Sequence, residues 1–411
     1  MGRDAVPRVL EGRIIFDQCV KILNRKGVRK MAYEKINSIQ QFNFQINRVL
    51  TYGEQACDAA AVRTVLKDVK TLPDWRKAWL GLAQRAETEG RWLHAAYAYR
   101  MVEFFASQPE KETVYAKCLA LFERAFAEEL HLDYERREVP FAGKRLSTIC
   151  LRAAKPKATV LVCGGYDSFI EEFLLQVSEL TERGYTVILF EGPGQGRSLR
   201  QGLYFQPDFE RSTQAVLDAY GVASCAMVGI SWGGYFALRS AAYEPRIVAA
   251  AAYDVLTDGI EVMTGVFPQP IASILRFCLK REWLCVVNAL TSRLRQKSLL
   301  ADWALTQGEY ITGTQTAVAF YEALRGHSLY GLTERLTQDI LLLAGEKDHY
   351  VPLTQYEWLR AHLPNARSVT ARLFTAAEGG EQHCQVGAHQ LAVEAIVRWL
   401  DGLFDKQQEA E

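Results

Sequence analysis

The spacing of apolar positions changes near residue 135 and divides the chain into two parts. Before this point apolar side chains recur at helical spacing, and no segment alternates convincingly as a half-buried strand does. The clearest helix is predicted to follow Leu72-Pro73-Asp74, with Asp74 as its N-cap and Gly90 as its end. Its apolar positions are Trp75, Trp79, Leu82, Ala83 and Ala86. We predict an N-terminal all-helical domain over residues 1–135.

From residue 136 onward, short apolar segments alternate with helical patterns. Two alternating segments around Ala142-Gly143-Lys144 carry a hairpin signal. Further strands are predicted at 158–163, 185–190, 224–228, 247–253, 339–344 and 368–375. This order indicates an α/β fold over residues 136–411, with a mostly parallel sheet and helices on both faces. The alternation stops at about residues 255–336, which read as helices, and we predict that this insertion is a lid over the carboxyl ends of the strands.

Composition narrows the class of protein. The chain has 411 residues, 49% hydrophobic and 23% charged, and its 48 basic residues balance its 48 acidic residues. This balance indicates neither nucleic acid nor an anionic membrane surface as a partner. The nine cysteines form no CxxC pair, which argues against a zinc site and a disulfide framework, and the first residues lack the apolar core of a signal peptide. We expect a cytoplasmic protein that takes a small-molecule substrate without a metal or cofactor. Its helical domain could pack on the lid or against another subunit in a homodimer.

The sequence Gly229-Ile230-Ser231-Trp232-Gly233 fits the Gly-x-Ser-x-Gly motif of a nucleophile elbow. A short apolar segment precedes it and a plausible helix follows it, so the strand, turn and helix that an elbow requires are all predicted. The serine of an elbow has a strained backbone, and a side chain at Gly229 or Gly233 would collide with the strand or the helix. Because the motif also occurs by chance, the downstream residues must decide whether it is chemical or structural.

A serine hydroxyl needs a base to take its proton and an acid to orient that base. In this architecture the acid and then the histidine follow the serine along the chain. Asp348 comes just past the predicted strand 339–344, and Glu346 is a weaker alternative because it follows Gly345 too closely to reach inward easily. Of the histidines after Asp348, His383 occupies the loop between the last predicted strand and the last helix. We predict Ser231, Asp348 and His383 as a catalytic triad.

An oxyanion hole in such a site would use two backbone N–H groups. One is predicted to belong to Trp232, directly after the serine, and the other to Gly165 or Tyr166, in the loop after strand 158–163. The pair Gly164-Gly165 could instead be only a tight turn. The glycine-rich loop 191–196 lacks the Gly-Lys-Ser/Thr ending of a phosphate cradle, so we interpret it as a turn beside the site.

Several motifs together resemble a known family. The segment 136–403 resembles an α/β-hydrolase fold. With the helical N-terminal domain, the chain is similar to the 2,6-dihydroxypseudooxynicotine hydrolase group, which includes fungal hydrolases that shorten polyketide chains in pigment pathways. The motifs are EVPF at 138–141, CGGYDS at 163–168, EGPGQG at 191–196, GISWGG at 229–234, GEKDHYVP at 345–352 and EQHCQ at 381–385. The resemblance implies hydrolysis of a carbon–carbon bond next to a ketone, with Ser231, Asp348 and His383 as the triad.

The resemblance also implies an extra acidic group after the elbow helix. Asp254, Asp258 and Glu261 are the candidates, and the sequence does not choose among them. The stretch between Asp254 and Asp339 is longer than the family pattern.

We therefore expect a serine hydrolase that cleaves a β-dicarbonyl or polyketide-like substrate through an acyl-enzyme, in secondary metabolism. One alternative is an acyltransferase or cyclase that uses the same triad. Others are an ester or thioester hydrolase and an inactive hydrolase fold that serves as a binding module.

Overall fold

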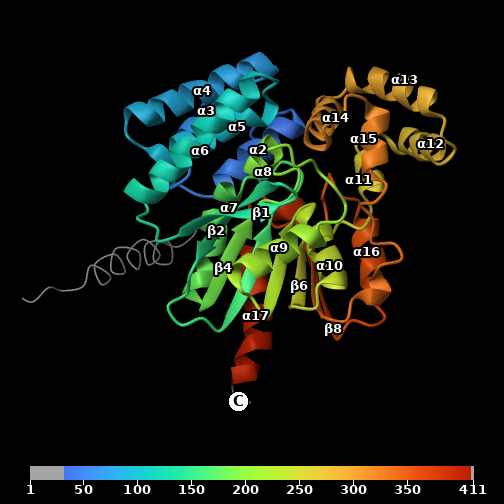
Figure 1. Ribbon diagram of the computed structural model, residues 1–411. Coiled ribbons are helices and arrows are strands. Elements are labelled where there is room, and N and C mark those ends of the chain that lie inside the picture. The colour runs from blue at the N-terminus through green and yellow to red at the C-terminus, as the bar shows by residue number, and fades with distance from the viewer. Residues whose placement is uncertain (1–31, 409–411) are drawn as a thin grey trace, which may run out of the picture. The chain divides into compact units, whose positions relative to one another are not determined.

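The chain divides into two units, one up to Asp133 and the other from Tyr134. The computed structural model describes residues 32–408 (Figure 1). In the first unit it describes α2 (Gln40–Thr51), α3 (Ala59–Leu66), α4 (Leu72–Thr88), α5 (Trp92–Phe105) and α6 (Glu110–Glu128). Trp75 stacks on Phe42 with 4.7 Å between ring centroids, and its Nε1–H donates to the Met101 carbonyl at 2.8 Å. The predicted apolar stripe is therefore the core of this helical unit.

Helix α4 begins earlier than predicted. Its N-cap is Thr71, whose hydroxyl accepts the N–H of Asp74 at 3.2 Å and donates to the Asp74 carboxylate at 2.7 Å. The prediction of Asp74 as the N-cap is wrong because Leu72 and Pro73 already belong to the first turn. A proline in the first turn costs the helix no hydrogen bond, since an N–H at that position would have no partner within the helix.

A sheet of eight strands forms the core of the second unit in the described part of the chain (Figure 1). The strands are β1 (Glu135–Phe141), β2 (Lys144–Leu151), β3 (Ala158–Cys163), β4 (Tyr185–Phe190), β5 (Cys225–Ile230), β6 (Ile247–Tyr253), β7 (Asp339–Gly345) and β8 (Ser368–Phe374). They lie in the order β1-β2-β4-β3-β5-β6-β7-β8. β2 pairs antiparallel with β1 and β4, and all other neighbours are parallel. The sheet is mostly parallel, as predicted.

Strand β5 lies in the parallel part of the sheet, between β3 and β6. Every residue of β5 is buried, as expected for a strand covered on both faces. Its register places Gly229 opposite Cys163 on β3 and opposite Ala252 on β6. The carboxyl ends of these three strands meet at one edge, which is where sites lie in sheets of this kind.

Helices cover both faces of the sheet (Figure 1). α7 (Ile170–Glu182) and α17 (Gln390–Gln408) pack against one another on one face. α9 (Glu210–Tyr220) and α10 (Gly233–Tyr243) pack against one another on the other face. The shorter helices α8 (Gly196–Arg200) and α16 (Leu353–Ala361) pack on β2 and β7.

The predicted helical insertion lies between β6 and β7. It contains α11 (Gly259–Gly265), α12 (Gln269–Lys280), α13 (Leu284–Arg295), α14 (Leu299–Thr312) and α15 (Ala317–Leu324). Side-chain caps explain where three of these helices begin, because Asp258 caps α11, Ser298 caps α14 and Thr316 caps α15. From residue 32 to residue 408, no helix has the combined length and apolar character that a bilayer span needs.

Candidate functional site

Ser231 lies on a sharp turn between β5 and α10. Its φ of 61° is in the left-handed region, which costs a serine free energy and is typical of a nucleophile elbow. The flanking glycines permit the turn. A Cβ on Gly229 would lie 1.7 Å from the Gly233 carbonyl oxygen, and a Cβ on Gly233 would lie 2.8 Å from the Cys163 carbonyl oxygen. The strand, turn and helix predicted around Ser231 are therefore present.

The structure brings Ser231, His383 and Asp348 together in one chain of hydrogen bonds. His383 Nε2 lies 2.8 Å from Ser231 Oγ, and His383 Nδ1 lies 2.6 Å from Asp348 Oδ2. An ionised carboxylate can only accept, so Nδ1 carries the proton that it donates to Asp348. This leaves Nε2 of a neutral His383 free to accept the Ser231 hydroxyl proton.

Asp348 is held rigidly by its own turn. Its second oxygen, Oδ1, accepts the N–H groups of Tyr350 and Val351 at 2.8 and 2.9 Å. Burial alone would raise the pKa of the Asp348 carboxyl, but the neighbouring His383 charge and these hydrogen bonds hold it below its ordinary value. Burial lowers the pKa of His383, and the Asp348 charge more than offsets this and raises it well above its ordinary value. The pair thus favours an ionised acid beside a basic imidazole.

The alternative acid, Glu346, lies elsewhere. Its carboxylate accepts the N–H of Ala376 at 2.7 Å, in the loop after β8, and makes no hydrogen bond to His383. This hydrogen bond joins the loop after β7, which contains Glu346, to the loop after β8. The geometry therefore favours Asp348 over Glu346 as the partner of His383.

A second carboxylate, that of Asp254, lies beside His383. Asp254 follows β6, and its Oδ2 is 3.6 Å from His383 Nδ1. The same oxygen accepts the Cys384 N–H at 2.7 Å, and Oδ1 accepts the Gln385 side-chain amide at 3.1 Å. Cys384 and Gln385 both have φ of 48°, so Asp254 holds the strained segment that carries His383. Burial, and next the charge of Asp348, raise the pKa of Asp254 to about 7.

The other two candidates for an extra acid have different partners. Asp258 caps α11 by accepting the Glu261 N–H at 2.9 Å. The Glu261 carboxylate accepts the Tyr330 hydroxyl and the Gln355 amide, each at 3.3 Å. Of the three candidates, the structure brings only Asp254 to His383.

The loops that carry the predicted oxyanion donors Trp232 and Gly165 meet beside Ser231. A Cβ on Gly165 would lie 2.7 Å from the Trp232 nitrogen and 3.0 Å from Ser231 Cβ, so the two loops touch at backbone level. In the part of the chain that the structure describes, the N–H groups of Trp232, Gly165 and Tyr166 donate no hydrogen bond. These amides could therefore receive a developing oxyanion.

Two side chains that support these loops were not predicted from the sequence. Gln195, in the glycine-rich loop 191–196, donates its amide to the carbonyl oxygens of Gly164 and Gly165 at 2.6 and 3.1 Å. His327 accepts the indole N–H of Trp232 at 3.1 Å, and burial lowers the pKa of His327 to about 3. The only sequence signal was the position of Gln195 in a glycine-rich loop after a strand. His327 has none, because the contact comes from the insertion.

The insertion contacts the site through Tyr166. The Tyr166 hydroxyl donates to the Ala304 carbonyl on α14 at 2.6 Å, and its ring lies 6.1 Å from the ring of Trp303. Trp303 also lies 6.3 Å from Tyr350, whose ring is 5.2 Å from His383. The helical insertion therefore borders the edge of the sheet that carries Ser231.

One group of side chains has the composition of a metal site. Asp254, His383 and Cys384 each place a potential ligand atom within 4.8 Å of the others. His383 Nδ1, however, is hydrogen-bonded to Asp348, and Asp254 Oδ2 is hydrogen-bonded to the Cys384 N–H. A metal ion here would have to displace Asp348 and would interrupt the Ser231–His383–Asp348 hydrogen bonds.

Comparison of the sequence with known proteins identifies its family. Residues 154–377 match the model of the family Hydrolase_4, described as serine aminopeptidase, S33. The hydrolase acrC of Aspergillus aculeatus is 24% identical over 89% of this chain and 96% of its own length. The hydrolyase poxO of Penicillium oxalicum is 28% identical over 88% of this chain and 96% of its own length.

A solved structure has the same fold. The crystal structure of 2,6-dihydroxy-pseudo-oxynicotine hydrolase superposes with a TM-score of 0.65 at 18% identity, over 87% of this chain and 95% of that chain. The likeness extends beyond the sheet, because it covers most of both chains. The predicted resemblance and the predicted α/β-hydrolase fold are both confirmed. Since the family model also covers more than half of the sequence, this chain belongs to the Hydrolase_4 family and is an α/β-hydrolase enzyme.

Proposed function

We propose that this α/β-hydrolase cleaves a carbon–carbon bond of a β-dicarbonyl or polyketide-like substrate through an acyl-enzyme on Ser231. The observation that carries the proposal is the continuous chain of hydrogen bonds from Ser231 Oγ through His383 to Asp348. Such a chain generates an alkoxide-like nucleophile at neutral pH, which a binding module does not need. The choice of a β-dicarbonyl substrate rests on the resemblance to the 2,6-dihydroxypseudooxynicotine hydrolase group.

The first half of the reaction forms the acyl-enzyme. His383 Nε2 takes the hydroxyl proton while Ser231 Oγ attacks one carbonyl carbon, and the carbonyl oxygen becomes an oxyanion facing the N–H groups of Trp232 and Gly165. When the oxyanion collapses, the bond to the neighbouring carbon breaks, and its electron pair leaves as an enolate that the second carbonyl stabilises. His383 returns its proton to that enolate, and the shortened ketone departs.

The second half uses water. His383 Nε2 removes a proton from water, the resulting hydroxide attacks the acyl carbon, and collapse expels Ser231, which recovers its proton from His383. The products are a carboxylic acid and a ketone. Asp348 remains ionised throughout and stabilises the imidazolium that forms twice.

Asp254 is proposed as a positioning residue. Its carboxylate fixes the backbone that carries His383, and it does not touch the reacting atoms. Because its pKa is about 7, it changes charge near neutral pH while it stays buried. The ionised form adds negative charge beside the imidazolium and the protonated form does not.

The variant Asp254→Asn keeps the size of the side chain and removes its charge, so it should distinguish an electrostatic role of Asp254 from a packing role. The folded state holds a proton on Asp254 up to about pH 7, whereas the unfolded chain releases it near the ordinary value of 3.8. This group therefore stabilises the fold most at low pH and loses that contribution as pH rises from about 4 to about 7. We expect the free energy of unfolding of the wild type to fall relative to the Asn variant over this interval, measured by urea denaturation.

The same variant has a kinetic readout. The Gln385 Oε1 atom is buried without a partner, so a flipped Gln385 amide can accept from the asparagine amide that replaces the Asp254 carboxylate and preserve the loop. We expect the pH profile of kcat to lose an inflection near pH 7. An unchanged pH profile with lowered stability would reduce Asp254 to a structural residue.

The bond that is broken can be tested with two substrates of matched size, a β-diketone and an alkyl ester of the same acyl group. Both would be incubated with enzyme in isotopically labelled water, and products followed by mass spectrometry. We expect the diketone to yield a ketone and an acid that carries the label. Ser231→Ala should form neither product.

Each other outcome assigns a different reaction to the same residues. Rapid turnover of the ester with no acid from the diketone would make the enzyme an ester or thioester hydrolase. A cyclised or acylated product without the label would make it a cyclase or acyltransferase. Either result contradicts the proposed carbon–carbon hydrolysis.

A further inference from the structure

The balanced charge of the whole chain conceals a basic segment on the insertion. Residues 269–297 span α12 and α13 and contain one acidic residue, Glu282. The basic residues of the same segment are Arg276, Lys280, Arg281, Arg293, Arg295 and Lys297. A local surplus of this size produces a positive field that the overall count does not reveal.

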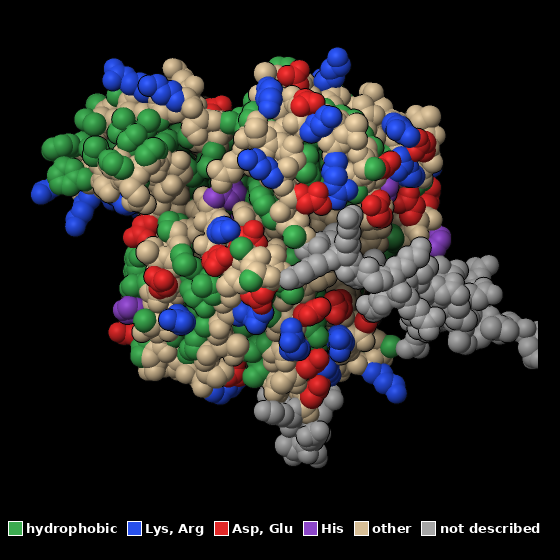
Figure 2. All heavy atoms as spheres, turned by 180° about the vertical axis from the view of Figure 1, so that it is seen from behind, with side chains coloured by type: hydrophobic (Ala, Val, Ile, Leu, Met, Phe, Trp, Pro, Cys, Tyr) green, Lys and Arg blue, Asp and Glu red, His purple; other side chains and the backbone are tan. Residues whose placement is uncertain are grey.

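The same two helices expose large apolar side chains. α12 packs inward through Ala272, Leu275, Cys278 and Leu279. On its outer face Ile274 and Phe277 are 51% and 49% exposed, and the neighbouring Trp283 and Val286 are 53% and 46% exposed. We call these four exposed side chains the lid patch. In Figure 2 the green side chains of α12 and α13 gather at the upper left of the molecule, with blue side chains at their margin.

The lid patch is organised rather than scattered. The rings of Phe277 and Trp283 meet edge to face with 5.5 Å between centroids, and the Arg281 guanidinium lies 5.6 Å from the Phe277 ring. A helix that is apolar on two faces is normally buried on both. The outer face of α12 would therefore be complemented by a partner with an apolar region and a negative charge.

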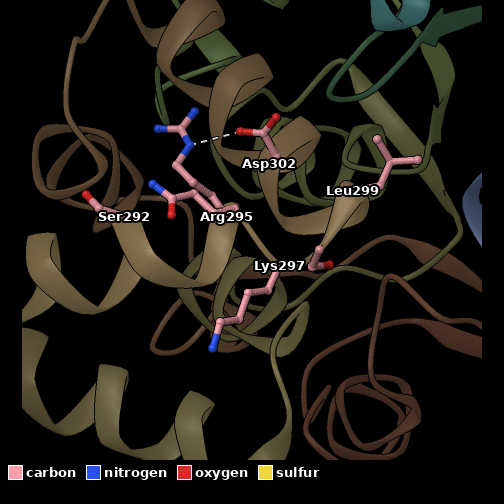
Figure 3. Close-up of a pocket in the computed structure, with 7 residues that line it drawn as sticks. Ser292, Arg295, Lys297, Leu299 and Asp302 are labelled. Carbon is pink, nitrogen blue, oxygen red and sulfur yellow. Dashed lines mark hydrogen bonds and ion pairs between the residues drawn. The ribbon is translucent and has the colours of Figure 1, made fainter. Parts of the chain in front are cut away.

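Not all of the basic side chains are available to such a partner. Arg295 lies in a pocket of about 670 Å³ at the end of α13, where it pairs with Asp302 and Glu309. Figure 3 shows Lys297 directed away from the Arg295–Asp302 pair. Within residues 32–408, the remaining exposed bases have no ion pair with a carboxylate. These are Lys280, Arg281, Arg293 and Lys297.

We propose that α12 and α13 form a docking surface for an anionic lipid bilayer. Ile274, Phe277 and Trp283 would enter the boundary between headgroups and acyl chains, where tryptophan and phenylalanine side chains are favoured. The unpaired bases would lie among the phosphates, where each contributes attraction that salt weakens. Because α14 follows α13 and contacts Tyr166, docking would place the edge of the site next to a bilayer that dissolves apolar substrates.

The charge argues against a second copy of the chain as the occupant. A twofold dimer brings the same patch of both subunits together, so the basic side chains of one copy would face those of the other. The positive charges of the two copies would repel each other in such a contact, whereas an anionic surface would neutralise them. The overall charge balance indicated no membrane partner, and the proposal departs from that expectation for this face alone.

The test uses the full-length enzyme and sedimentation with vesicles of phosphatidylcholine alone or mixed with phosphatidylserine. We expect binding to the mixed vesicles at low salt, weaker binding at high salt, and little binding to phosphatidylcholine. The double variant Lys280→Glu/Arg281→Glu should lower partitioning onto the mixed vesicles by at least about 25-fold, at about fivefold for each base. Phe277→Ser/Trp283→Ser should lower it as well, and Trp283→Phe should remove a fluorescence change that accompanies binding.

A matched control reverses two other exposed bases, at the start of β2, Lys144→Glu/Arg145→Glu, with the same change in net charge. We expect this control to keep vesicle binding, and every variant to keep labelling by a fluorophosphonate because none of these residues touches Ser231. Wild-type enzyme that stays in the supernatant with mixed vesicles would overturn the proposal. Equal loss in the control would also overturn it, and self-association abolished by Phe277→Ser/Trp283→Ser would assign the face to a second copy of the chain instead.

Discussion

Ser231→Ala should abolish covalent labelling by a fluorophosphonate and lower turnover by roughly 10⁶-fold, because the members of a triad act as a unit. The change removes one oxygen atom and leaves a small side chain at a left-handed φ of 61°. The elbow glycines still permit the turn, so the variant should fold as the wild type does. The measurements are labelling followed by mass spectrometry and kcat/KM on a substrate found by the assay above.

The matched control for this variant is Ser240→Ala. Ser240 is a buried serine on α10, and its Oγ lies 3.0 Å from the Thr213 hydroxyl, away from His383. It should keep both labelling and turnover. A Ser231→Ala enzyme with turnover near that of the wild type would remove Ser231 from the mechanism, and labelling that survives it would place the reactive nucleophile elsewhere.

Asp348→Asn should lower kcat by roughly 10⁴-fold with little change in structure. The asparagine amide can donate to His383 Nδ1, which stabilises the tautomer whose proton sits on Nε2. That tautomer cannot accept the Ser231 hydroxyl proton. The loss of negative charge also lowers the pKa of His383, so the acidic limb of the remaining activity should move to lower pH.

Glu346→Gln provides the control, since this carboxylate is near in sequence but bonds to the Ala376 backbone. Its activity and pH profile should match those of the wild type. If Glu346→Gln lost activity and Asp348→Asn kept it, the two acids would exchange roles. A pH profile that stays in place in Asp348→Asn would mean that Asp348 does not set the basicity of His383.

The sequence was most informative where local patterns determine structure. The strands of the sheet were predicted from apolar runs between glycine-rich turns, and the chain order of serine, acid and histidine led to Asp348 and His383. The choice between Asp254 and Glu261 could not be made in this way. It depends on how the loop after β6 meets the loop after β8, and those two segments are 130 residues apart.

Side chains that act through long-range contacts left no pattern in the sequence. His327 reaches Trp232 only because the insertion folds back over the carboxyl edge, and no spacing rule marks it. Exposed apolar residues on α12 and α13 have the same helical spacing as core residues, so periodicity cannot tell one from the other. The N-cap of α4 was misplaced for a simpler reason, because a proline can stand either before a helix or inside its first turn.

The insertion between β6 and β7 also sets the order in which the machinery appears during synthesis. A ribosome releases Ser231 and its elbow first, then the helices of the insertion, and only afterwards the strand and loops that carry Asp348 and His383. The serine and the imidazole are separated by 152 positions. If Ser231 acts with Asp348 and His383 as proposed, the nascent chain lacks the complete site until β7 and the loop after β8 have left the ribosome.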